Sequence, residues 1–138
     1  MIKSSLGHLQ LMINPANMAF YKDLLTFLGW AVWYEDDNML GMGTEQGSSL
    51  WFSAPLKEEV KNDYDGMGMN HLGIAVPQQS DVDEAVTYLQ QHDIKALFDT
   101  PRHRPEFCQS SDQTYYQVMF ESPDRLLFEV VYTGPLVK

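Results

Sequence analysis

Basic residues are scarce in this chain of 138 residues, in which nine Lys and Arg stand against nineteen Asp and Glu, for a net charge of −10. Nucleic acids and anionic membrane surfaces are usually bound through basic patches, so we expect neither as a partner. Cys108 is the single cysteine, which excludes an intrachain disulfide framework. The chain contains no apolar run of about 20 residues that could span a membrane. The N-terminal segment lacks the pattern of a signal peptide, and we expect a cytoplasmic protein.

Two common catalytic motifs are also missing. The glycine-containing stretch GMGTEQG at 41–47 lacks the Lys-Ser/Thr pair of a phosphate-binding P-loop. No G-x-S-x-G nucleophile elbow is present anywhere in the sequence. The sequence therefore gives no support to P-loop nucleotide chemistry or to serine catalysis of the α/β-hydrolase type.

The chain does contain an internal duplication. Residues 6–13 alternate as a strand, a helical apolar pattern follows Asn14-Pro15 and ends at Gly29, and strand-like runs stand at 30–35, 38–43 and 48–53. The same order returns with strands at 70–76, 94–99, 115–120 and 126–132 and a helical pattern after the first of them. Both halves are thus β-α-β-β-β, and GHLQLMI in the first half matches NHLGIAV in the second.

We therefore predict an α+β fold in which residues 1–138 form one domain. It would consist of a βαβββ module at 1–54, a polar linker at 55–69 and a second βαβββ module at 70–138. The second copy has a long insert at 100–113, TPRHRPEFCQSSDQ. Long loops on small domains are often functional, so we predict that this insert is a lid or a pocket wall.

Glu129 stands alone among the apolar residues of LLFEVV. A buried, unpaired carboxylate costs on the order of several kcal/mol, so it shifts its pKa, finds a partner or binds a metal. His8 and His71 occupy equivalent positions near the start of the first strand of each copy. Two imidazoles and one carboxylate form a three-ligand set that leaves positions open for water and substrate. The alternative is that both histidines are structural residues that only make hydrogen bonds.

Aromatic residues provide further candidates around such a site. Trp51 falls at the place of Glu129 when the last strands of the two copies are aligned, and it offers an aromatic wall for a flat ligand, or plain core packing. Tyr115 and Tyr116 point to opposite faces of their strand, so one of them can reach the site. We take Tyr116 as the candidate substrate-binding residue and general acid.

The insert contributes three charged or titratable candidates. Arg102 and Arg104 are candidates for holding an anionic group of the substrate, and His103 is a second candidate for acid–base chemistry. The alternative is that all three belong to a solvated loop.

The sequence resembles the vicinal oxygen chelate superfamily, which includes glyoxalase I, bleomycin-resistance proteins, fosfomycin-resistance enzymes and extradiol dioxygenases. The resemblance covers essentially the whole chain and rests on GHLQLMI and FYKDLLTFLGW in the first copy and on NHLGIAV and YYQVMFESPDRLLFEVVY in the second. The segment SPDRLLFE resembles the family's D-P-D-G-x-x-x-E ending. It departs from that ending at Ser122, which replaces the first Asp, and at Arg125, which replaces the Gly.

The resemblance implies that the two modules curl into a cupped, mostly antiparallel sheet around one divalent metal ion, Fe, Mn, Zn or Ni. By motif match its ligands would be His8, His71 and Glu129. A frequent fourth ligand of the family is a Glu at the position of Trp51, so its loss disfavours lactoylglutathione lyase activity.

The resemblance also implies a function and an assembly. The implied function is that of a metal-dependent lyase, isomerase or dioxygenase acting on a small oxygen-bearing metabolite. The implied assembly is a homodimer in which His8 can come from a different subunit than His71. The alternative is a non-catalytic drug- or metabolite-binding protein of the bleomycin-resistance type.

Overall fold

The structure is a computed structural model that describes all 138 residues. The chain divides into two compact units, Met1–Lys61 and Asn62–Lys138, which we call the first unit and the second unit. The first unit contains β1 (His8–Met12), a short 3₁₀ helix (Pro15–Asn17), α1 (Met18–Phe27), β2 (Ala31–Glu35), β3 (Met39–Gly43) and β4 (Ser49–Ser53). The second contains β5 (Leu72–Ala75), α2 (Gln79–Gln91), β6 (Leu97–His103), a 3₁₀ helix (Pro105–Phe107), β7 (Gln113–Glu121) and β8 (Leu127–Pro135).

Each unit has one four-stranded sheet, and the two sheets have the same topology. The strand order is β1-β4-β3-β2 in the first unit and β5-β8-β7-β6 in the second. The first and last strands of each unit pair in parallel, and the other neighbours pair antiparallel. The predicted α+β class and the duplicated β-α-β-β-β order are therefore confirmed. None of the helices is long and apolar enough to cross a membrane.

Local sequence signals explain where the first helix begins and ends. The side chain of Asn14 accepts a hydrogen bond from the backbone N–H of Ala16 at 3.0 Å, and Pro15 occupies the first helical position. Gly29 follows the helix with a φ of +87°, a left-handed conformation that glycine adopts without steric cost. The chain therefore turns back directly into β2.

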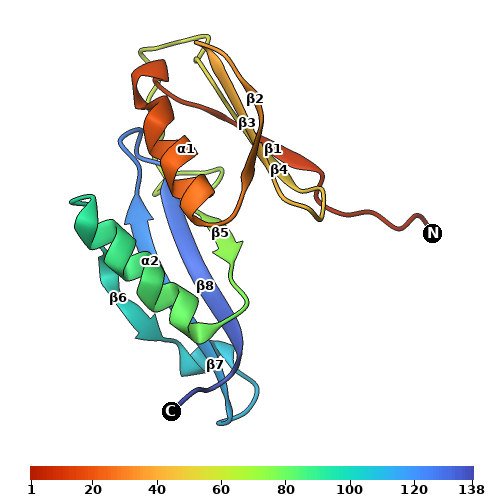
Figure 1. Cartoon of the computed structure of the whole chain (residues 1–138), viewed down its shortest axis with the longest axis vertical. Coiled ribbons are helices and arrows are strands. Elements are labelled where there is room, and N and C mark those ends of the chain that lie inside the picture. The colour runs from red at the N-terminus through yellow and green to blue at the C-terminus, as the bar shows by residue number, and fades with distance from the viewer. The chain divides into compact units, whose positions relative to one another are not determined.

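One helix lies against one face of the sheet in each unit, and this face holds most of the core (Figure 1). In the first unit Tyr21 of α1 stacks on Phe52 of β4, with ring centroids 4.5 Å apart. In the second unit Phe120 of β7 and Phe128 of β8 stack at 5.7 Å beside buried residues of α2. The residues that alternate with these lie on the opposite face of each sheet, away from α1 and α2.

The insert predicted at 100–113 is less irregular than expected. Residues up to His103 continue β6, in which Arg102 pairs with Gln117 and His103 pairs with Tyr116 of β7. The strand register shifts between Leu97 and Arg102, so β6 carries extra residues as a bulge. Within the bulge Phe98 has a φ of +57°, a conformation that non-glycine residues rarely adopt.

Candidate functional site

Glu129 lies at the centre of the second unit's sheet, where it is only 4% exposed. Its Oε1 accepts a hydrogen bond from the Tyr115 hydroxyl at 2.7 Å, and its Oε2 accepts one from Gln117 Nε2 at 2.9 Å. Both donors come from β7, whose Met119 pairs directly with Glu129 across the ladder. Strand alternation places Tyr115, Gln117 and Met119 on the same face. The buried carboxylate is therefore hydrogen-bonded within its own sheet.

His71 lies one residue before β5 and turns toward the same carboxylate. Its Nε2 is 4.0 Å from Glu129 Oε2, and its Nδ1 is 2.7 Å from the side-chain oxygen of Asn70. The amide nitrogen of Asn70 donates to the backbone carbonyl of Tyr64 at 2.9 Å, which fixes the amide oxygen toward the imidazole. Because that oxygen can only accept, the proton of the neutral ring lies on Nδ1. The lone pair on Nε2 is then free for a ligand.

The pair formed by His71 Nε2 and Glu129 Oε2 fits a divalent metal ion in its donor chemistry. Protein nitrogen and oxygen ligands lie about 2.0–2.2 Å from zinc, so two tetrahedral ligands are about 3.4 Å apart, and the His71 and Glu129 atoms at 4.0 Å would move about half an ångström closer to share one ion. A metal-binding histidine usually donates its other ring N–H to an oxygen, as His71 does to Asn70. Within neither unit do three or more His, Cys, Asp or Glu side chains form a group that could hold a metal ion.

Gly73 makes room for the Glu129 carboxylate. The two residues are partners in the parallel ladder between β5 and β8. A Cβ at position 73 would lie 3.3 Å from Glu129 Oε1, closer than ordinary van der Waals contact. The glycine in NHLGIAV therefore has a packing role beside the candidate site.

A pocket of about 390 Å³ opens beside this carboxylate, entirely within the second unit. Its walls combine aromatic and apolar side chains with few charged ones. The lining residues are Tyr64, Asp65, Asn70, His71, Phe98, Arg104, Phe107, Tyr115, Gln117, Met119, Leu127 and Glu129. An apolar pocket with a small number of convergent polar groups is typical of a small-molecule site.

Arg104 is the single cationic side chain of the pocket lining other than the titratable His71. Its Nε donates to Glu106, and its Nη1 donates to the side-chain oxygen of Gln117 at 3.3 Å. Its guanidinium lies 4.5 Å from the centroid of the Phe107 ring, in cation–π geometry. Gln117 is 1% exposed and therefore joins Arg104 to Glu129 through one buried amide.

Tyr115, rather than the predicted Tyr116, is the tyrosine at this site. Tyr116 lies on the other face of β7, where its hydroxyl donates to Asp83 of α2 at 2.6 Å. Burial and the hydrogen bond to Glu129 raise the pKa of Tyr115 to about 12. Its hydroxyl therefore stays protonated at neutral pH and acts as a hydrogen-bond donor.

Of the three candidates in the insert, only Arg104 lines the pocket. The His103 ring stacks on Tyr116 with centroids 4.3 Å apart, and its Nδ1 bonds the hydroxyl of Thr114. Arg102 is 3.9 Å from Glu106, and its side chain is 42% exposed. The predicted roles of His103 and Arg102 at the site thus lack support, because strand pairing draws both residues into β6, away from the pocket lining.

The first unit contains the remaining two predicted residues, His8 and Trp51. Trp51 pairs with Gln10 as Glu129 pairs with Gly73, so the strand registers confirm that Trp51 takes the place of Glu129. A Cβ at Gly41 would lie 2.5 Å from the Trp51 ring, so the ring lies directly over this glycine, and Trp33 covers Gly43 in the same way. His8 begins β1 and is exposed. The roles of His8 as a ligand and of Trp51 as a substrate wall stay predictions.

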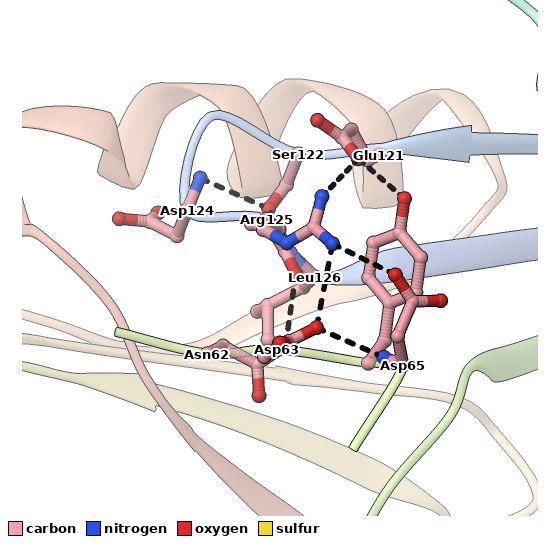
Figure 2. Close-up of polar contacts among 9 residues, drawn as sticks. Asn62, Asp63, Asp65, Glu121, Ser122, Asp124, Arg125 and Leu126 are labelled. Atoms are coloured by element: carbon pink, nitrogen blue, oxygen red, sulfur yellow. Dashed lines mark hydrogen bonds and ion pairs between the residues drawn. The ribbon is translucent and has the colours of Figure 1, made fainter. Parts of the chain in front are cut away.

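Arg125, in the turn between β7 and β8, forms ion pairs with the segment that carries Tyr64. Arg125 donates to Asp63 at 3.3 Å and to Asp65 at 3.1 Å, and it lies 3.6 Å from Glu121 (Figure 2). Its guanidinium also lies 4.3 Å from the centroid of the Tyr64 ring. These contacts hold Tyr64, whose carbonyl orients Asn70 and so the imidazole of His71.

Arg125 also explains the departure from the D-P-D-G-x-x-x-E pattern. Its φ is +57°, in the left-handed region that a glycine would adopt at no cost. The hydroxyl of Ser122 accepts hydrogen bonds from the backbone N–H groups of Asp124 and Leu126 at 3.2 and 3.1 Å. The Ser122 hydroxyl and the left-handed Arg125 thus close the turn in this chain.

Sequence reasoning missed Asn70 and Gln117. A usable signal exists for Gln117, because it is the one polar side chain after the tyrosine pair in YYQVMF and shares a strand face with Tyr115. No comparable signal identifies Asn70, since its amide acts through a backbone carbonyl six residues earlier.

Comparisons with known proteins support the fold. No protein-family model matches the sequence, and no curated protein matches it. Among solved structures, a proposed glyoxalase from Bacillus halodurans is 21% identical, with a TM-score of 0.76 over 92% of this chain and 94% of that chain. A glyoxalase/dioxygenase from Nostoc punctiforme is 16% identical, with a TM-score of 0.67 over 94% and 91% of the two chains.

A third similar structure contains a metal. The fosfomycin resistance protein FosX from Listeria monocytogenes, solved with Mn(II) and a sulfate ion, is 16% identical, with a TM-score of 0.67 over 96% of this chain and 93% of that chain. The three likenesses establish that the chain has the glyoxalase/bleomycin resistance/dioxygenase fold. The fold that the resemblance implied is thereby confirmed.

Proposed function

We propose, from the premise that the chain has this fold, that it is a metal-dependent enzyme acting on a small oxygen-bearing metabolite. The observation that supports the proposal is the pair formed by His71 Nε2 and Glu129 Oε2, 4.0 Å apart. The Asn70 amide keeps the imidazole in the tautomer that a metal ligand needs. The third ligand is His8, as the duplication predicts, supplied by this chain or by a second copy.

A bound divalent ion would supply Lewis-acid stabilisation of negative charge on a substrate oxygen. The residues of this chain would orient the partners of that chemistry. Tyr115 and Gln117 each donate to one oxygen of Glu129 and so fix the direction of its carboxylate. Gln117 also holds Arg104 at the pocket wall, where the guanidinium can receive a substrate.

The site is tested by the metal content of protein purified without chelators, measured by elemental mass spectrometry. We expect about one equivalent of a transition metal per chain, and its loss in His71→Ala. The matched control is His92→Ala, because His92 is an exposed histidine at the end of α2 whose Nδ1 bonds the Tyr88 carbonyl. Stoichiometric metal in folded His71→Ala would rule out the assignment. The identity of the metal then directs the assays, with iron pointing to oxygenase activity and nickel, zinc or manganese to isomerase, lyase or transferase activity.

A second candidate function is non-catalytic sequestration of a drug or metabolite. The observation that favours it is Trp51, which replaces a carboxylate by an indole whose Nε1 donates to Ser49 at 3.0 Å. If neither the purified protein nor protein titrated with Mn(II), Zn(II), Ni(II) or Fe(II) binds metal, this function becomes the better one.

We also propose that the chain forms a homodimer, as the resemblance implies. Light scattering after size exclusion should then give twice the chain mass of 15.8 kDa. A mass of 15.8 kDa at high protein concentration would contradict the proposal and would require His8 to act within its own chain.

A further inference from the structure

The pocket of the second unit combines one cation with exposed aromatic rings, and this combination restricts its ligand. Phe98 and Phe107 line the pocket, yet they are 55% and 57% exposed. Aromatic side chains normally lose most of their exposure in a folded protein, because burial of a ring removes a large apolar area from water. Two half-exposed rings at one pocket therefore leave apolar surface that a ligand can cover.

The conformation of Phe98 adds to this argument. The residue lies in the bulge of β6 with a φ of +57°, and the next residue, Asp99, has a φ of +55°. Left-handed conformations are unfavourable for residues other than glycine. The bulge thus holds an aromatic side chain at the pocket in spite of a local backbone cost and with little burial in return.

Arg104 supplies the polar half of the recognition. Its Nε is used by Glu106 and its Nη1 by Gln117, whereas its Nη2 has no partner within the chain. The cation–π contact with Phe107 and the hydrogen bond to the buried Gln117 hold the guanidinium at the pocket wall. A guanidinium that is fixed on one side and has free donors on the other is suited to a carboxylate or a related oxyacid.

The charges around the pocket favour one negative charge on the ligand over two. Asp65 is paired with Arg125 at 3.1 Å, while Glu129 remains as a buried carboxylate joined to Arg104 through Gln117. Arg104 already pairs with Glu106, and the remaining donors of its guanidinium can receive one anionic group of a ligand. A second negative charge would be repelled by Glu129 at low local dielectric.

We propose that this pocket binds small aromatic or flat apolar monoanions, with the acidic group on Arg104 and the apolar body against Phe98 and Phe107. The inference deepens the proposed function, on which it rests only for what happens at His71 and Glu129. Binding through Arg104 needs no metal, so the two proposals can fail separately.

The test is an NMR titration of the full-length, chelator-treated protein with benzoate at neutral pH. Benzamide is the uncharged isostere, acetate lacks the ring, and phenylphosphonate at pH 8 carries a second charge. We expect saturable amide shifts at Arg104, Phe107 and Tyr115 with benzoate. Each of the other three probes should bind at least about tenfold more weakly, the loss expected when a charged hydrogen bond, the apolar contact or charge balance is removed.

Variants assign the binding to the guanidinium. Arg104→Gln should weaken benzoate binding about tenfold. The matched control Arg102→Gln removes the same charge two residues earlier in the chain, outside the pocket lining, and should leave benzoate binding unchanged. The proposal would be overturned if benzoate bound no more tightly than benzamide or acetate, or if phenylphosphonate bound more tightly. It would also be overturned if benzoate caused no saturable shifts, or if Arg104→Gln bound benzoate as well as the unaltered chain. The comparison of probes on the unaltered chain keeps the test valid if a variant fails to fold.

Discussion

At the scale of single residues, the site depends on side chains that are small or neutral rather than on the charged ones alone. Glu129 is buried without a salt bridge to Lys or Arg, and it is held instead by a phenol and an amide. Such hydrogen-bonded burial needs accurate placement of each donor, because a buried carboxylate that loses a partner is costly. The glycine beside the carboxylate is part of this placement.

Gly73→Ala provides a test at this scale. The added Cβ would lie 3.3 Å from Glu129 Oε1, and the carboxylate can retreat only by stretching its bonds to Tyr115 and Gln117. We expect a loss of about 1 kcal/mol in the free energy of unfolding, as for mild overpacking. Urea unfolding measures it. Gly7→Ala is the control, since a Cβ there meets nothing within 4 Å. Equal effects of the two substitutions would show that the contact carries no strain.

The sequence predicted which residues would face each other only where strand alternation decides the outcome. His71 and Glu129 come together because β5 and β8 are neighbours in the sheet, a pairing that the β-α-β-β-β order alone does not specify. Alternation places Tyr115 and Tyr116 on opposite faces of β7 without saying which face the helix covers, so the sequence could not choose between them. Asn70 could not be predicted, since its role depends on a carbonyl in a segment that looked like a linker.

At the scale of elements, the turn between β7 and β8 holds the segment 62–65 in place through ion pairs and hydrogen bonds. Arg125 contacts three partly exposed carboxylates and the buried ring of Tyr64 there (Figure 2). Individual exposed ion pairs contribute little, but several that share one guanidinium can order a segment without regular structure. The segment carries Tyr64, which is 7% exposed and packs with Met119 and Leu127.

The pH dependence of stability should report on the ion pair between Arg125 and Asp63. The backbone N–H of Asp65 and the guanidinium of Arg125 lower the pKa of Asp63 below its usual value. A lowered carboxyl pKa stabilises the folded state above the unfolded pKa of about 3.9, and the contribution disappears as the pH falls through the folded pKa. Asp63→Asn should therefore lower the urea midpoint at pH 7 and have little effect well below pH 4.

The control for this prediction is Asp37→Asn, which removes the same charge from an exposed bend. Circular dichroism gives both midpoints. An equal deficit of Asp63→Asn at neutral and acidic pH would mean that the side chain acts through its size or its hydrogen bonds rather than through its ionisation.

At the scale of the whole molecule, charge is the property that the sequence predicts most directly. A net charge of −10 on 138 residues repels itself in the compact state. Raising NaCl from about 0.01 M to about 0.15 M shortens the screening length from about 30 Å to about 8 Å. We expect the melting temperature to rise over this range in calorimetry, and KCl should act in the same way. A fall would show that attractive pairs, such as Lys22 with Glu35 at 2.8 Å, outweigh the general repulsion.

The tryptophans that cover Gly41 and Gly43 make it possible to observe one unit separately by fluorescence. Trp30, Trp33 and Trp51 are the three tryptophans of the chain, and all of them belong to the first unit. Indole emission therefore reports on Met1–Lys61 alone, while the pocket beside Glu129 is silent at these wavelengths. A denaturation curve followed by indole emission, laid over one followed by far-ultraviolet ellipticity, thus measures whether the two halves of this duplicated chain unfold as one cooperative body or as two.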